Sequence, residues 1–241
     1  CYDCLYYNHS HGSSEDQPQV LQSVGVTEEG TPEIWNMFME VNQRIRENRG
    51  WEFEIPGYPY TPVNEGQILS YGDYDLETVG LKGHTYGQMG LYDRNHKILF
   101  CADQVIDGIV PIVGTTYPDE HLLKGYFDSL ERLKHQYGDC LILPAHKEPI
   151  RDVKRVVDRI VFAYLDKTDL IKHILDHGHH RMTTREVACL AYGIDHVPRD
   201  QSEFIKLKMV ISKTFSCLEY LYDEDFAIRT LEGGSYYWEA P

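Results

Sequence analysis

The sequence lacks several features that would place it in other classes of protein. It has no run of about 18 apolar residues, so we do not expect it to span a membrane. Positive charge is scarce: 23 Lys and Arg face 38 Asp and Glu, and the net charge of −15 argues against a nucleic-acid partner bound through its phosphates. No GxSxG nucleophile motif occurs. The six cysteines are scattered and mostly in apolar contexts, which favours reduced, buried thiols in a cytoplasmic protein.

What the sequence does contain is a set of strand-like apolar segments that each lead into a side chain able to bind a metal. The segments are residues 76–81, 98–101 and 140–143, and the side chains that follow them are His84, Asp103 and His146. The segment 98–101 has the composition of a buried strand. Imidazole and carboxylate groups suit an N/O-ligated zinc or iron site. The chain therefore predicts a metal centre at three strand ends.

These segments carry a resemblance to a known family. The sequences GHTYGQMGLYD at 83–93, ADQV at 102–105 and PAH at 144–146 resemble, in order and spacing, the hydrolase branch of the metallo-β-lactamase superfamily. Lys82 stands where the family commonly has Pro, and Ala145 stands where Gly is usual, but neither departure removes a ligand. The resemblance implies an α/β fold: part of an αββα sandwich, with helices outside two facing mixed sheets.

The resemblance also implies roles for the three side chains. His84 would complete one metal site, Asp103 would bridge two metals as the catalytic carboxylate, and His146 would complete the second site. Two zinc ions are the cofactor implied, and the same ligand set tolerates iron. Thr85 and Tyr117 are candidates for lining the substrate pocket, and Gly87 is expected to give the ligand loop a positive φ.

One part of the family pattern is not intact in this sequence. The HxHxDH motif, which supplies further ligands in the family, has its nearest counterpart at residues 9–14, where Ser replaces both the Asp and the final His. We therefore expect the chain to be a piece of a longer protein whose N-terminal half carries the motif, and to hold metal weakly by itself. The alternative is a degenerate metal site.

The chain divides into two predicted domains, an incomplete metallo-β-lactamase domain at 1–151 and a C-terminal domain at 152–241. In the first, residues 1–30 are polar and turn-rich, a helix follows up to Gly50, and a second helix starts at Pro118. Four strands are predicted between these helices, at residues 67–71, 75–81, 88–93 and 97–101.

The C-terminal part follows the pattern of a small winged-helix module. Three helices are predicted: one at 152–177, a short one that begins at a capping box at Thr183 and ends at Tyr192, and one at about 202–222. A β-hairpin with its turn at 232–235 follows them. Because a small module cannot bury the apolar stripe of the third helix alone, we expect it to pack on the hydrolase part or on a second copy of the chain.

The function predicted is that of a metal-dependent hydrolase acting on a small ester, thioester or related carbonyl substrate through a metal-activated water. Two alternatives stay open. One is an iron-dependent enzyme of the same fold that handles sulfur substrates, and the other is a non-catalytic interaction protein whose metal site has decayed.

Overall fold

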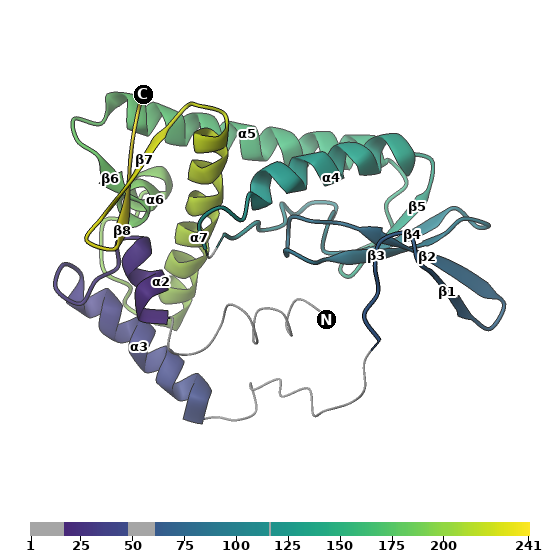
Figure 1. Cartoon of the computed structure of the whole chain (residues 1–241), viewed down its shortest axis with the longest axis horizontal. Helices are drawn as coiled ribbons and strands as arrows, with labels where there is room; N and C mark the ends of the chain where they lie inside the picture. The colour runs from purple at the N-terminus through teal and green to yellow at the C-terminus, as the bar shows by residue number, and fades with distance from the viewer. Residues whose placement is uncertain (1–16, 48–60, 116) are drawn as a thin grey trace.

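The structure, a computed structural model, describes residues 17–47, 61–115 and 117–241. The motif candidate at residues 9–14 lies outside them. Among the residues described, every helix is too short or too polar to cross a bilayer. The helices (Figure 1) are α2 (Gln17–Ser23), α3 (Pro32–Glu47), α4 (Leu122–Gln136), α5 (Val153–His177), α6 (Thr184–Tyr192) and α7 (Gln201–Asp223). The strands are β1 (Ile68–Tyr71), β2 (Tyr74–Gly80), β3 (Met89–Asp93), β4 (Ile98–Ala102), β5 (Leu141–Pro144), β6 (Met182–Thr183), β7 (Ile228–Glu232) and β8 (Ser235–Glu239).

The larger sheet has five strands in the order β1-β2-β3-β4-β5. The first four strands run antiparallel, and β5 pairs with β4 in parallel after the chain has passed through α4. Parallel neighbours end at the same edge of a sheet. The residues that follow β4 and β5, Asp103 and His146, are therefore brought together by the topology.

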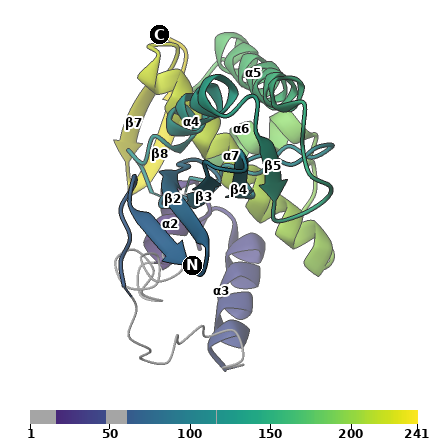
Figure 2. The same cartoon turned by 90° about the vertical axis from the view of Figure 1, so that its right-hand side faces the viewer.

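One face of this sheet is covered by α4 and α5, which lie on the same side of it (Figure 1 and Figure 2). Leu99 and Cys101 of β4 point into this core and are fully buried, as is Ile142 of β5. Phe100, between the two buried residues of β4, is 44% exposed. The prediction of a buried strand at 98–101 was wrong for Phe100, because the helices described cover one face of the sheet and the side chains of the strand alternate between its faces.

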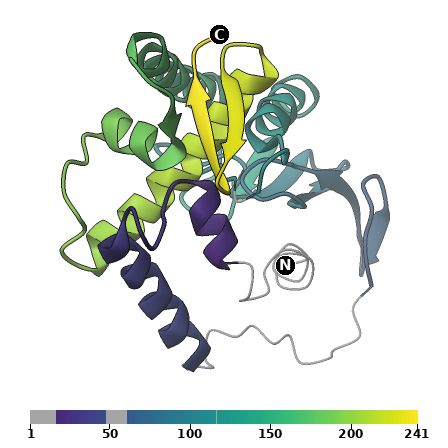
Figure 3. The ribbon, with the colours of Figure 1, turned by 60° about the vertical axis from the view of Figure 1, so that its left-hand side comes forward.

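The described N-terminal helices pack on the C-terminal part of the chain rather than on the sheet (Figure 3). The Ser235 hydroxyl donates to the carbonyl of Gln22, in α2, over 2.6 Å. The ring of Phe38, in α3, lies edge-on to that of Phe204, in α7, at 4.6 Å between centroids. Residues 17–23 had been predicted as polar turn; they form α2 because this hairpin gives the helix a surface to bury Leu21 against.

Helix α4 begins four residues later than the predicted start at Pro118. Asp119 and His121 both adopt left-handed backbone conformations, with φ of +65° and +49°. The amide of Asp119 donates a hydrogen bond to the carboxylate of Glu219, in α7. The segment before α4 is thus fixed to a distant helix, and this tertiary bond replaces the local helix start that the sequence suggested.

The C-terminal part has the predicted order of helix, helix, helix and hairpin, with a small sheet in the order β6-β8-β7. The capping box between Thr183 and Glu186 is present, and Gly233 and Gly234 turn the hairpin with positive φ. The stripe of α7 is buried at Phe204, Leu207, Val210, Ile211, Phe215, Leu218 and Leu221. Part of it packs on the preceding part of the chain, as predicted. The winged-helix assignment and the boundary at 151/152 stay predictions.

Candidate functional site

His84 is placed by a backbone that only glycine can adopt. Gly83, directly before it, has φ of +146°, and a Cβ at this position would lie 2.3 Å from the ring of Tyr126. The loop after β2 therefore passes closely over α4. The predicted positive φ at Gly87 was wrong; among the described glycines of this loop it is Gly83 that has it.

The ring of His84 is oriented by a backbone carbonyl. Its Nδ1 lies 2.7 Å from the carbonyl oxygen of Ile112. Because a carbonyl can only accept, Nδ1 carries the proton, and in the neutral ring the lone pair is on Nε2. Nε2 lies 3.8 Å from Asp103 Oδ2. A metal-binding histidine is commonly held in this way, with its second nitrogen bonded to a carbonyl.

Asp103 and His146 follow β4 and β5 through strained turns. Ala102 has φ of +49° at a register shift in the β4–β5 ladder, and its carbonyl accepts from the amide of Ala145 over 3.0 Å. Lys147, after His146, has φ of +71°. Each of these two predicted ligands therefore adjoins a residue in the left-handed region. For residues other than glycine this conformation is costly, and it concentrates at functional sites.

The three predicted ligands converge, with Asp103 in the middle. His146 Nε2 lies 3.7 Å from Asp103 Oδ1, and His84 faces the other carboxylate oxygen. Asp103 Oδ1 is buried and has no hydrogen-bond partner among the residues that the structure describes. A buried, unpaired carboxylate oxygen is costly unless a cation or a donor joins it. Two imidazoles and such a carboxylate are a donor set that suits zinc or iron.

The convergence does not amount to a closed metal site. No group of three or more His, Cys, Asp or Glu within the described ranges is arranged so that it could hold an ion. The side chain of His146 is 68% exposed, and both imidazoles stand beyond hydrogen-bonding distance of Asp103. His84, Asp103 and His146 therefore fit a metal as a partial set of ligands.

A buried amide network below the ligand loops was missed by the sequence reasoning. Gln88 Nε2 donates to Gln104 Oε1 over 2.8 Å, and the Gln104 amide donates to the hydroxyl of Ser129. The hydroxyl of Tyr126 donates to the carbonyl of Gln104 over 2.8 Å. The network joins the loop of His84 to the residue after Asp103. The sequence signal for this network was the presence of a glutamine in each of two motif segments, Gln88 in 83–93 and Gln104 in 102–105.

The segment that orients His84 is itself held by the C-terminal helices. The hydroxyl of Tyr164, in α5, donates to the carbonyl of Pro111 over 2.7 Å and accepts from the amide of Val113 over 2.8 Å. The hydroxyl of Ser216, in α7, accepts from the amide of Thr115 over 2.8 Å and donates to the carbonyl of Val113 over 2.9 Å. These bonds fix the backbone on both sides of Ile112.

The buried thiol nearest the site is not a candidate ligand. Cys101 lies on β4, two residues before Asp103, and its side chain points into the core. Burial, together with the charge of Asp103, raises the pKa of the Cys101 thiol to about 12. Because this side chain lies in the core rather than in the loops beyond the strand, the groups that converge in the loops are imidazole and carboxylate.

Two hollows lie near the ligand loops. One, of about 380 Å³, is lined by Tyr86 and Gly87 of the His84 loop together with residues of α4. The other, of about 390 Å³, lies between Ile112, α6 and α7. Neither lining includes Thr85 or Tyr117. The backbones of these two residues form hydrogen bonds within their own loops, from the Gly83 amide to the Thr85 carbonyl and from the Tyr117 amide to the Glu120 carboxylate. Their assignment to the pocket stays a prediction.

Comparison with known proteins identifies partial relatives by sequence. No protein-family model matches the chain. It is 43% identical over 53 residues to the acyl-coenzyme A thioesterase MBLAC2 of Gallus gallus, a match that covers 22% of this chain and 19% of that protein. The human protein of the same name is 33% identical over 63 residues, which cover 24% of this chain and 23% of its own length. The chain thus spans about a fifth of the length of the curated relatives it matches.

Solved structures match nearly the whole chain. A metallo-beta-lactamase family protein from Thermus thermophilus superimposes with a TM-score of 0.71 at 19% identity, covering 98% of this chain and 67% of that one. A beta-lactamase domain protein from Burkholderia ambifaria gives 0.73 at 17% identity, covering 92% and 60%. The chain has the metallo-β-lactamase fold, as the motif resemblance implied.

Proposed function

We propose that this chain supplies three metal ligands of a hydrolase that cleaves acyl thioesters, with coenzyme A thioesters as the substrate class. The observation that carries the proposal is the convergence of His84 and His146 on opposite oxygens of Asp103, one of which is buried and accepts no hydrogen bond from the described residues. A carboxylate that faces two imidazoles without hydrogen-bonding to either is an arrangement that a bound cation would stabilise.

The substrate class is supported by the relatives rather than by the geometry. The matched sequences are acyl-coenzyme A thioesterases by name, and the solved neighbours carry the metallo-β-lactamase name. The resemblance implies an ester, thioester or related carbonyl substrate, and the thioester is the member of this group that these names favour. A cytoplasmic location, a homodimer and the absence of a nucleic-acid partner stay predictions.

The residues present divide the work at the site. Ile112 holds the Nδ1 proton of His84 and so leaves Nε2 free to bind a cation. Asp103 directs one oxygen toward each imidazole. The hydrogen bond from the Ala145 amide to the Ala102 carbonyl holds the ends of β4 and β5 next to each other. When bound to such groups, a zinc or iron ion supplies Lewis acidity and a hydroxide at neutral pH.

Asp103→Ala in the full-length protein tests the proposal. We expect hydrolysis of an acyl-coenzyme A to fall by roughly 10³ or more, because a ligand carboxylate is lost. The unfolding free energy should stay near that of the wild type, because the substitution removes a buried oxygen that accepts no hydrogen bond from any described residue. His96→Ala is the matched control: His96 lies in the turn between β3 and β4 and pairs with Asp93 away from the site. Release of free thiol measures turnover, and urea unfolding measures stability.

The outcome also separates the alternatives. A variant that keeps a large fraction of wild-type turnover at saturating zinc would exclude the bridging role of Asp103. Absence of hydrolysis in the wild type, with any added metal, would instead favour the non-catalytic interaction protein. Metal analysis of the purified full-length protein separates zinc from iron, and iron together with activity on sulfur substrates would favour the iron-dependent enzyme.

A further inference from the structure

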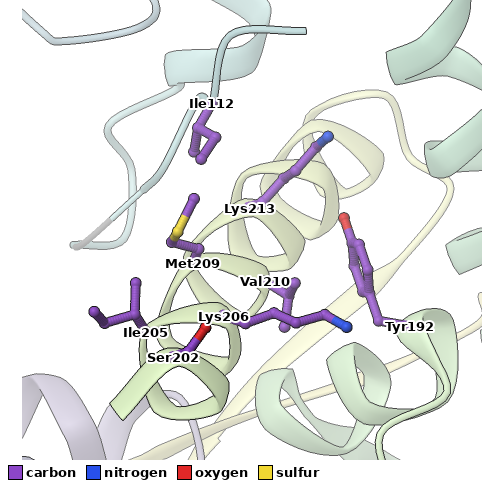
Figure 4. A pocket seen from close by; sticks show the side chains of 8 residues that line it. All are labelled: Ile112, Tyr192, Ser202, Ile205, Lys206, Met209, Val210 and Lys213. Atoms are coloured by element: carbon purple, nitrogen blue, oxygen red, sulfur yellow. The ribbon is translucent and has the colours of Figure 1, made fainter. Parts of the chain in front are cut away.

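The hollow between Ile112, α6 and α7 is formed mainly by one face of α7. Figure 4 shows the α7 residues that line it: Ser202, Ile205, Lys206, Met209, Val210 and Lys213. They recur every three or four positions, which places them on one side of a helix. Tyr192 of α6 and Ile112 complete the lining. A volume of about 390 Å³ is enough for part of a cofactor-sized molecule.

Two large apolar side chains of this face are exposed to solvent. Ile205 is 47% exposed and Met209 is 42% exposed, although they lie beside the buried stripe of the same helix. Exposed apolar groups that gather in a hollow, rather than singly, are typical of a surface that binds something. An apolar portion of a ligand would be covered here.

The charge of the hollow is opposite to that of the chain. Lys206 and Lys213 are its charged lining residues, and the lining contains no carboxylate. Within the described part of the chain neither lysine forms an ion pair, although the whole sequence carries a net charge of −15. The Lys213 ammonium lies 4.6 Å from the centre of the Tyr164 ring. Two unpaired cations in an acidic protein favour an anionic ligand.

Lys213 is held in an unfavourable environment. Burial and the neighbouring charge of Lys167 lower the pKa of its ammonium group. The Lys167 ammonium lies 4.4 Å from the centre of the ring of Tyr192, a residue that lines the hollow, and donates to the carbonyl of Ala191 over 3.2 Å. An anion bound between these side chains would relieve both the desolvation and the repulsion.

A polar group of the hollow also lacks a partner. The hydroxyl of Tyr192 is buried and makes no hydrogen bond within the described residues. A buried hydroxyl without a partner costs about 1–3 kcal/mol, so such groups are usually bonded to water or to a ligand. The Tyr192 hydroxyl and the two ammonium groups are therefore three donors that await acceptors.

The hollow is connected to the candidate metal site through one residue. The side chain of Ile112 lines the hollow, while its carbonyl oxygen accepts from His84 Nδ1. A molecule seated in the hollow thus lies within one residue of the group that orients a predicted ligand. This proximity suits a substrate whose reacting bond is at the metal site and whose remainder lies beside α7.

We propose that this hollow binds the phosphate-bearing portion of a thioester substrate, with phosphate oxygens on Lys206, Lys213 and the Tyr192 hydroxyl. The apolar part of the ligand lies along Ile205 and Met209. The identity of the ligand as a thioester rests on the proposed function, whereas the preference for a multiply charged anion rests on the three donors. Lysine binds phosphate as a point charge, and a phosphate offers several oxygens at once.

Calorimetric titration of this chain with coenzyme A, and with pantetheine as a probe that lacks the phosphates, tests the proposal. We expect coenzyme A to bind at least about tenfold more tightly than pantetheine, because charged hydrogen bonds contribute about 1.5–3 kcal/mol each. Lys206→Met and Lys213→Met should each weaken coenzyme A by about fivefold to tenfold and leave pantetheine unchanged. Lys208→Met is the matched control, since Lys208 is an exposed lysine of α7 outside the lining.

Lys206 is exposed, so its substitution keeps the test valid even if Lys213→Met fails to fold. Equal binding of coenzyme A by wild type, Lys206→Met and Lys208→Met would overturn the proposal. So would lysine-dependent binding of decanoate without binding of coenzyme A, because the anion would then be a carboxylate. The binding assay requires no hydrolysis, so the two proposals can fail separately. Phosphate-dependent binding without thioesterase activity in the full-length protein would refute the proposed function alone. Thioesterase activity together with coenzyme A binding that does not depend on the lysines would refute the proposed pocket alone.

Discussion

The five-stranded sheet and the C-terminal helices bury their apolar residues to different extents. Phe100, in the middle of the sheet, is 44% exposed, whereas Trp238 and Phe215 in the C-terminal part are fully buried. The sheet has a helical layer on one face, while α7 is packed by α4, α5 and α6. Among the described residues, the sheet that leads to the predicted ligands thus has the more exposed face, although both parts contribute to one buried core.

The difference shows where the ligand loops obtain their rigidity. A sheet with one covered face fixes its strand ends through few side chains, so the loops beyond those ends need other support. Tyr164 and Ser216 provide it through hydrogen bonds to residues 111–115. The C-terminal helices therefore hold the segment whose Ile112 carbonyl orients His84, a predicted ligand.

The largest expected effect contrasts a buried side chain of the C-terminal part with an exposed side chain of the sheet. Trp238→Ala removes a fully buried ring that packs on Phe215 and donates to Thr184 over 2.9 Å, and we expect a loss of about 3–5 kcal/mol of unfolding free energy. Phe100→Ala on the open face of the sheet should cost less than about 1 kcal/mol. Urea unfolding of both variants measures the contrast. Equal losses would mean that the outer face of the sheet is covered in solution.

The next effect concerns the buried carboxylate where the two regions meet. Burial raises the pKa of Glu219 to about 7, from an ordinary value of 4.5, despite the hydrogen bonds from Asp119 and Thr115 and the charge of Arg229. Between these two values the folded state binds more protons than the unfolded state, so stability falls as pH rises from about 4.5 to about 7. Above pH 7 Glu219 is ionised in the folded state, and the full cost of burying its charge lowers the unfolding free energy.

Glu219→Gln should therefore stabilise the protein more at pH 8 than at pH 5. The difference between the two pH values should be on the order of 3 kcal/mol at most. Urea unfolding of wild type and variant at both pH values gives this double difference, in which the titration of other groups cancels. A variant that gains the same stability at pH 5 as at pH 8 would show that the Glu219 carboxyl is not shifted.

A smaller effect tests whether the helices support the ligand segment. Tyr164→Phe leaves the Val113 amide and the Pro111 carbonyl without their partner, and we expect a loss of about 2 kcal/mol in unfolding free energy. Tyr220→Phe is the control, because the Tyr220 ring packs on Phe127 and its hydroxyl makes no hydrogen bond within the described residues. Its loss should be below about 0.5 kcal/mol. The rate of hydrogen exchange at the Val113 amide measures the local effect. If this amide is as well protected in Tyr164→Phe as in the wild type, α5 does not support the segment.

Much of the fold was predictable because its signals are local. The apolar spacing of α4, α5 and α7, the capping box at Thr183 and the glycine turn of the last hairpin each depend on neighbours within a few residues. Strands β1 to β5 likewise lie within a residue or two of their predicted bounds. Helix α2 was not predictable, since what stabilises it is a hairpin more than 200 residues away.

The sequence by itself determined which side chains could bind a metal, since His84, Asp103 and His146 each follow a strand and match a family pattern. Tertiary structure decided the rest: the left-handed turns at Ala102 and Lys147, the carbonyl of Ile112 on His84, and the two lysines that line the hollow with Ile112 and form no ion pair with a described residue. Local sequence specifies strands and turns through short-range sterics. Unpaired groups and strained backbones arise when segments that are distant in the sequence, such as His84 and Ile112 or Ala102 and Ala145, are packed together, because the packing free energy then outweighs the local preference.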